Sequence, residues 1–227
     1  FMAELNSKLN SMKTKYREIF MKSSDAILAR IEEIRPEGLK GDILDKFEPN
    51  SLGTSWQNAV IDMFENDISK EIYRKWQEVL ELRKNFDCKG CATCCNLACS
   101  EFSPEELKRR AQNGDKFATQ FTSIFIPYGS KEEARKVYPQ YIELLDDTID
   151  EDVYFYHCPK LTDCKRCSDY NNRPQICRDF PDNPLCILPK SCGFYEWRQE
   201  VEPVAMMLHA MMEIIEYYKE KLCTLAP

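Results

Sequence analysis

Twelve cysteines among 227 residues are the feature of this sequence most able to do chemistry. The first group runs Cys88-x2-Cys91-x2-Cys94-Cys95 and is followed by Cys99. A second group lies downstream and consists of Cys158, Cys164, Cys167, Cys177, Cys186 and Cys192. A C-x2-C turn lets two thiolates converge on one ion, and three cysteines at x2 intervals can supply three corners of an iron–sulfur cluster. The spacing therefore predicts a metal site.

The first group does not complete a ferredoxin-type run, because Ala98 stands where the fourth cysteine would be. The remaining ligands must come from elsewhere, and the second group is the obvious source. Together the two groups offer more thiolates than one tetrahedral site can use. Two mononuclear centres, or one cluster with a second ion, would both account for them, and the spacing does not divide the cysteines between centres.

Disulfides and simply buried thiols are the competing interpretations of the cysteines. The N-terminal segment lacks the continuous apolar run of a signal peptide, so we expect a cytoplasmic protein, whose compartment keeps thiols reduced. We expect no membrane association, because no stretch approaches the roughly 20 apolar residues of a spanning helix. A net charge of −7 argues against nucleic acid as the main partner.

Other side chains close to the cysteines are weaker candidates. Arg178 follows Cys177 directly and could stabilise the negative charge of thiolates. His157 precedes Cys158 and could act as a ligand or as a hydrogen-bond donor to one. Cys223 stands apart near the C-terminus, and we expect an ordinary thiol there.

Three separated motifs resemble the CxxCxxCC proteins, the YkgJ-like family of zinc- or iron-chelating proteins. They are Cys88-Lys-Gly-Cys91-Ala-Thr-Cys94-Cys95, then Cys158-Pro-Lys-Leu161, then Arg173-Pro-Gln-Ile-Cys177-Arg-Asp-Phe180-Pro181. The same cysteine pattern is similar to one in flagellin lysine N-methylases, where it implies an iron–sulfur centre. By position, the resemblance implies eight metal ligands: Cys88, Cys91, Cys94, Cys95, Cys158, Cys167, Cys177 and Cys186. It makes weaker ligands of Cys99, Cys164 and Cys192, and this chain departs from the family pattern at Cys167-Ser-Asp-Tyr170.

The sequence predicts that the elements that position these cysteines are mainly helices. Apolar residues at helical spacing predict helices over 2–35 with a possible break at Ser23 and Ser24, and from Thr54 or Ser55 to about 85. In the second helix Val60, Phe64, Ile68, Ile72, Trp76 and Leu80 form the expected buried face. Further helices are predicted over 104–126 and 131–149. Residues 154–194 are rich in proline and cysteine, have almost no periodicity, and need cross-links to be ordered.

The last helix carries a heptad-like apolar stripe that includes Val201, Val204, Leu208 and Leu222. It predicts packing on the N-terminal helices of the same chain, with a dimer interface as the alternative. We therefore expect an all-α fold, in which a helical scaffold supports irregular, metal-organised cysteine-rich loops. The expected parts are an N-terminal helical region over 1–85, a metal-binding region over 86–195 and a C-terminal helix over 196–227.

The sequence thus predicts a metal-binding protein that holds iron–sulfur or zinc, with a narrow preference for iron–sulfur, and has a redox or metal-handling role. Metal ions are the expected partners, and a protein partner or substrate is not identified by any motif. A metal-dependent enzyme similar to a lysine N-methylase and a zinc-stabilised interaction module remain alternatives. No catalytic residue is indicated, because nucleophile elbows, phosphate loops and dinucleotide fingerprints are absent from the sequence.

Overall fold

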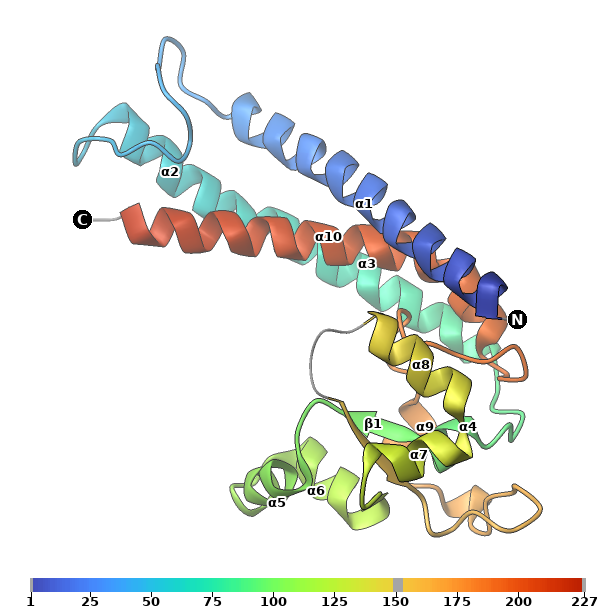
Figure 1. Cartoon of the computed structure of the whole chain (residues 1–227). Helices are drawn as coiled ribbons and strands as arrows, with labels where there is room; N and C mark the ends of the chain where they lie inside the picture. The colour runs from blue at the N-terminus through green and yellow to red at the C-terminus, as the bar shows by residue number, and fades with distance from the viewer. Residues whose placement is uncertain (1, 149–152, 226–227) are drawn as a thin grey trace. The chain divides into compact units, whose positions relative to one another are not determined.

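The structure is a computed structural model that describes residues 2–148 and 153–225, with side chains described from residue 14 onwards except at 144–148 (Figure 1). Contacts divide the chain into two compact units. One contains Phe86–Arg198 with the first ten residues, and the other contains Ser11–Asn85 and Gln199–Pro227. Taken together, the described residues are mostly helical, as the sequence predicts. In the described part of the chain, no helix combines the length and apolar character needed to cross a membrane.

Long helices build the unit that contains Ser11–Asn85 and Gln199–Pro227. α1 spans Met2–Glu33, α2 spans Leu52–Met63, α3 spans Ser69–Leu82 and α10 spans Tyr195–Leu225 (Figure 1). A short 3-10 turn, Arg83–Asn85, ends this helical region. The expected break at the serine pair in the first helix is wrong, because α1 continues through it.

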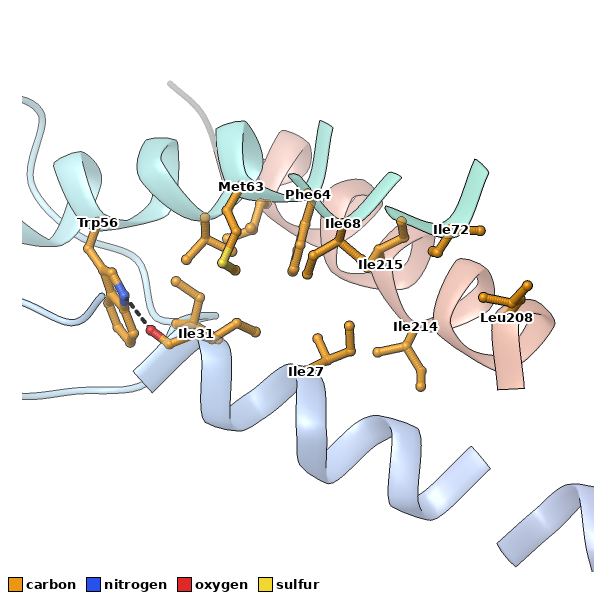
Figure 2. Packing of buried hydrophobic residues seen from close by; sticks show 13 residues of the cluster. Ile27, Ile31, Trp56, Met63, Phe64, Ile68, Ile72, Leu208, Ile214 and Ile215 are labelled. Atoms are coloured by element: carbon orange, nitrogen blue, oxygen red, sulfur yellow. Dashed lines mark hydrogen bonds between the residues drawn. The ribbon is translucent and has the colours of Figure 1, made fainter. Parts of the chain in front are cut away.

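One apolar core holds these helices together, and side chains from α1, from α2 to α3 and from α10 all enter it (Figure 2). Ile27 and Ile31 of α1 meet Phe64 and Ile68, while Leu208 comes from α10. The expected stripe on the last helix is therefore covered within the chain, apart from Val204, which is exposed. Burial of such side chains contributes about 1.5–3 kcal/mol each.

The second helix contains a π-helical turn, Phe64–Ile68, between α2 and α3. On a regular α-helix a strict four-residue repeat drifts by about 40° per step, because 3.6 residues make a turn. A π turn holds more residues, so it realigns the repeat with one face. Val60 and Ile72, on either side of this turn, are buried as predicted. Near the end of the helix Val79 is buried instead of Leu80, which is only partly buried.

This second helix also begins earlier than the sequence predicts. Ser51 is the N-cap, and its hydroxyl accepts the Thr54 backbone N–H at 3.3 Å. Within the first turns of this helix, the Gln57 amide donates to the carbonyls of Ile43 and Asp45 at 2.8 and 2.9 Å. A buried glutamine thus satisfies two loop carbonyls that would otherwise have no partner.

In the other unit the two predicted helices are each broken once. α5, Pro104–Gln112, and α6, Lys116–Ile124, are separated by a turn in which Gly114 adopts a φ of +86°. α7, Lys131–Val137, and α8, Pro139–Thr148, are separated where a proline begins the second helix. The last residue of the predicted 131–149 helix lies outside the described residues.

A small antiparallel sheet accompanies the helices, so the fold is mostly helical, as expected, but not purely so. Its strands are β1, Ala98–Ser100, β2, Ile126–Pro127, and β3, Tyr154–His157, in the order β1-β3-β2. Cys99 pairs with Phe155 across β1 and β3. The aromatic sequence of β3 suits a strand, but the strands are too short to show a reliable alternation of apolar and polar residues.

Candidate metal centre

The first cysteine group lies on a tightly wound turn that leads into α4, Thr93–Asn96. Gly90 and Ala92 adopt positive φ values of 69° and 64°, which turn the chain sharply after Cys88 and after Cys91. The Gly90 backbone N–H donates to Cys88 Sγ at 3.4 Å. An amide directed at a sulfur is the arrangement expected of a C-x2-C metal turn, because it offsets the charge of a thiolate.

The chain at Gly193 lies directly against this turn. A Cβ placed on Gly193 would meet the backbone oxygen of Asp87 at 1.8 Å, so only glycine permits the approach. The approach brings Cys192 next to the first group. The Tyr170 hydroxyl, in the 3-10 turn Tyr170–Asn172, adds a second link by donating to the Cys88 carbonyl at 2.9 Å.

A second set of cysteines is positioned by the end of β3 and the hairpin that follows it. The Cys158 backbone N–H donates to the Cys95 carbonyl at 2.7 Å. Leu161 then forms an isolated bridge with Cys167, which folds residues 160–168 into a hairpin. Cys177 comes from α9, Gln175–Asp179.

These segments enclose a cavity of about 500 Å³. Ten cysteines line it: Cys88, Cys91, Cys94, Cys95, Cys99, Cys158, Cys167, Cys177, Cys186 and Cys192. All eight predicted ligands are among them, together with Cys99 and Cys192. Cys164 and Cys223 do not line the cavity and are exposed. All twelve cysteines are free thiols in this structure.

Cys91 and Cys192 share a hydrogen bond between their sulfurs. This bond lowers the pKa of Cys91 to about 5 and, together with burial, raises the pKa of Cys192. The charge of Cys88 also contributes to the raised pKa of Cys192.

Adjacent Cys94 and Cys95 form a second sulfur–sulfur pair. The hydrogen bond from Cys94 lowers the pKa of Cys95 to about 7, and the same bond, with burial, raises the pKa of Cys94. Beyond their bond the two thiols share one charged neighbour, Cys91, and differ in the others. Cys94 experiences the charges of Cys91 and Cys88, whereas Cys95 also experiences a guanidinium, that of Arg173.

The pKa of Cys177 depends on other cysteines of the second set. Burial, the largest cause, and the charges of Cys158, Cys95 and Cys167 together raise it to about 11, and Arg173 opposes the increase. The pKa of Cys158 is raised by burial and then, among neighbouring charges, by those of Cys95 and Cys167. The charges of Cys95 and Cys167 thus act on both Cys158 and Cys177.

Cys186 and Cys99 complete the set of cysteines that line the cavity. Burial is the largest cause that raises the pKa of Cys186 to about 12, and the charge of Cys99 contributes to the increase. The backbone carbonyl of Cys186 accepts the Arg198 Nε at 3.0 Å, which fixes this part of the chain.

Arg173 takes the electrostatic role that the sequence assigned to Arg178. The Arg173 guanidinium stacks 3.8 Å from the centre of the Tyr170 ring, and its Nε donates to the Tyr170 carbonyl at 3.1 Å. It lines the cavity, whereas the Arg178 Nε donates to the Arg173 carbonyl at 2.7 Å. Sequence reasoning missed Arg173 because adjacency to Cys177 favoured the wrong arginine.

His157 is directed elsewhere. Its ring lies 5.0 Å from the ring of Tyr128, and it is not among the cavity-lining residues. Alternation along the strand places His157 and Cys158 on opposite sides. The structure thus gives no support to the predicted role of His157 as a ligand.

Within residues 2–148 and 153–225, no three side chains of His, Cys, Asp or Glu converge closely enough to hold a metal ion as they stand. The chemistry of the cavity nevertheless fits such a group. Soft sulfur donors suit zinc and iron–sulfur clusters, and Arg173 with amide N–H groups offsets their charge. A rotation about χ1 moves a cysteine sulfur without moving the backbone. The backbone positions of these cysteines therefore permit their sulfurs to converge on a metal ion.

Comparison with known proteins adds no relative. No protein-family model, curated protein or solved structure matches this chain. The resemblance to the CxxCxxCC proteins therefore rests on the motif residues alone and stays a prediction.

Proposed function

We propose that this chain is a metal-binding protein that holds iron–sulfur or zinc through its clustered cysteines, with iron–sulfur favoured. One observation carries the proposal: thiols from residues 88–99 and 158–192, far apart in the sequence, line one cavity. Ten thiols around one cavity, with free cysteines throughout, form a donor set typical of such centres. The preference for iron–sulfur comes from the C-x2-C-x2-C run at Cys88.

The metal also has a structural consequence. Between Cys158 and Phe194 the chain forms only short turns and one short helix, α9. Such a segment buries too little apolar surface to offset the entropy of ordering it. Thiolate–metal bonds tie it to the turn that carries Cys88 and to α4, because ligands come from both parts of the chain. Metal binding free energy then contributes directly to folding.

The test is anaerobic purification of the full chain, followed by elemental analysis for iron and zinc, a sulfide assay and a visible spectrum. Iron with acid-labile sulfide and visible absorption supports iron–sulfur, and a colourless protein that contains zinc supports zinc. A chain that contains neither metal, and takes up neither when reconstituted, contradicts the proposal.

A matched control uses the two cysteines outside the cavity. The double variant Cys164→Ser/Cys223→Ser should retain the metal content of the unaltered chain, because these exposed thiols do not line the cavity. If it loses metal as completely as Cys91→Ser/Cys177→Ser does, binding does not depend on the cavity.

A further inference from the structure

We propose that the thiolates form two separate four-cysteine centres, with Cys192 rather than Cys186 as a ligand. This inference rests on the proposed metal binding. The first centre consists of Cys88, Cys91, Cys94 and Cys192. The second consists of Cys95, Cys158, Cys167 and Cys177. Four thiolates are the full ligand set of a structural zinc site and of a cubane iron–sulfur cluster.

The first centre is built from one turn and one distant segment. The turn supplies Cys88, Cys91 and Cys94. Cys192 joins them because Gly193 lies against the Asp87 carbonyl, and its sulfur already shares a hydrogen bond with Cys91. The Tyr170–Cys88 hydrogen bond holds the same turn from another direction.

The second centre is built around the end of β3. The backbone bond from Cys158 to Cys95 places these two residues side by side, and the Leu161–Cys167 bridge returns the hairpin to the same place. α9 then supplies Cys177, which lines the same cavity as the other three members of the set.

The adjacent pair divides between the centres for a geometric reason. Cys94 and Cys95 are successive residues of α4, and successive side chains of a helix point about 100° apart. Two such thiols are poorly placed to bind one ion, but well placed to bind two neighbouring ions. Cys94 continues the x2 spacing of Cys88 and Cys91 along the first turn, while the Cys95 carbonyl accepts the Cys158 N–H at 2.7 Å.

Cys186 is excluded by its surroundings. Its backbone N–H donates to the Asn183 carbonyl at 3.1 Å and its carbonyl accepts the Arg198 Nε at 3.0 Å, so its backbone is held by contacts outside both sets. Cys99 belongs to β1, where the backbone is fixed by pairing with Phe155. These two thiols therefore lie at the cavity wall outside both centres, although the family resemblance names Cys186 as a ligand.

Serine variants test the division, with metal bound per chain as the measurement. Cys192→Ser and Cys91→Ser should each lose one centre, and the double variant should lose no more than either alone. Combining Cys192→Ser with Cys167→Ser should remove both centres. Cys186→Ser is the matched control, because it lies in the same segment as Cys192, and it should retain both.

A measurement on the unaltered chain guards against variants that fail to fold. The metal-free chain is titrated with Zn²⁺, alkylated, and examined by mass spectrometry for protection of each cysteine. Protection of Cys192 should rise together with that of Cys91, and protection of Cys158 together with that of Cys177. Two results would overturn the two-centre assignment. One is protection of Cys192 that rises with that of Cys158 instead of that of Cys91. The other is a loss of metal from Cys186→Ser equal to the loss from Cys192→Ser. A chain that binds no metal at all contradicts the proposed function instead.

Discussion

At the scale of single residues, small details of the backbone decide which cysteines meet. Gly193 allows the segment that carries Cys192 to touch the carbonyl of Asp87. Tyr170 holds Arg173 in place by stacking and by a hydrogen bond. Neither contact involves a thiol, yet both position the cysteine groups, which shows that positioning residues extend beyond the ligands.

We expect Gly193→Ala to destabilise its unit by about 3 kcal/mol, at the upper end of overpacking costs, because the new Cβ meets backbone rather than a movable side chain. Gly114→Ala is the control, because nothing lies within 4 Å of its Cβ and only its positive φ opposes the change. That strain costs about 1–2 kcal/mol. Urea unfolding measures both, and equal losses would show that the approach of Gly193 to Asp87 is not tight.

At the scale of elements, the helices end and begin through specific hydrogen bonds. The Ile31 carbonyl belongs to the last turn of α1, where no intrahelical donor is available. The Trp56 indole N–H satisfies it at 3.1 Å, within the buried core (Figure 2). At the start of α5 the Ser103 hydroxyl accepts the Glu106 N–H at 3.2 Å.

Trp56→Phe should lower the free energy of unfolding by about 1–3 kcal/mol, because it leaves the Ile31 carbonyl without its donor. Thermal unfolding followed by circular dichroism measures the loss. Trp76→Phe is the control, since Trp76 is only partly buried and packs at the edge of the same core. A loss at Trp76 as large as at Trp56 would argue that ring volume, rather than the hydrogen bond, matters.

Ser103→Ala should cost about 1 kcal/mol through the loss of the N-cap of α5. Ser123→Ala provides the contrast, because Ser123 is an exposed residue inside α6, where alanine is the better helix former. Hydrogen exchange of the α5 and α6 amides should therefore change in opposite directions. Faster exchange in both variants would contradict the assignment of the cap.

At the scale of the whole molecule, the two units differ in what stabilises them. The long helices share one core of large apolar side chains, including Phe64 and Trp56. The cysteine-bearing unit has smaller separate clusters, one around Ile142 and Phe155 and another around Leu107 and Phe121. Its stability should therefore depend more strongly on metal.

We expect chelation to loosen only the cysteine-bearing unit. Amide protons of β3 and α9 should lose protection when metal is removed, whereas those of α2 and α3 should keep it. Hydrogen exchange with mass spectrometry measures this, and restoring Zn²⁺ or iron with sulfide to the same sample serves as the control. Equal loss of protection in both units would contradict the inference that the cysteine-bearing unit, with its smaller apolar clusters, depends more strongly on metal.

Local patterns in the sequence determined the helices and the kind of site. Val60, Phe64, Ile68 and Ile72 are buried as their spacing indicates, because helical periodicity is a local property. The short strands and the break between α5 and α6 escaped prediction, because a few residues give too weak a periodic signal and a turn at Gly114 interrupts an otherwise helical pattern.

The residue type that lines the cavity was likewise predictable, since the cysteines cluster in the sequence, whereas the binding of metal stays a prediction. Only the tertiary structure decided which thiols become neighbours. The family resemblance ranks Cys186 above Cys192, but the approach of Gly193 to Asp87 brings Cys192 to the first group. Contacts between segments about 100 residues apart depend on chain folding as a whole, and no local pattern encodes them.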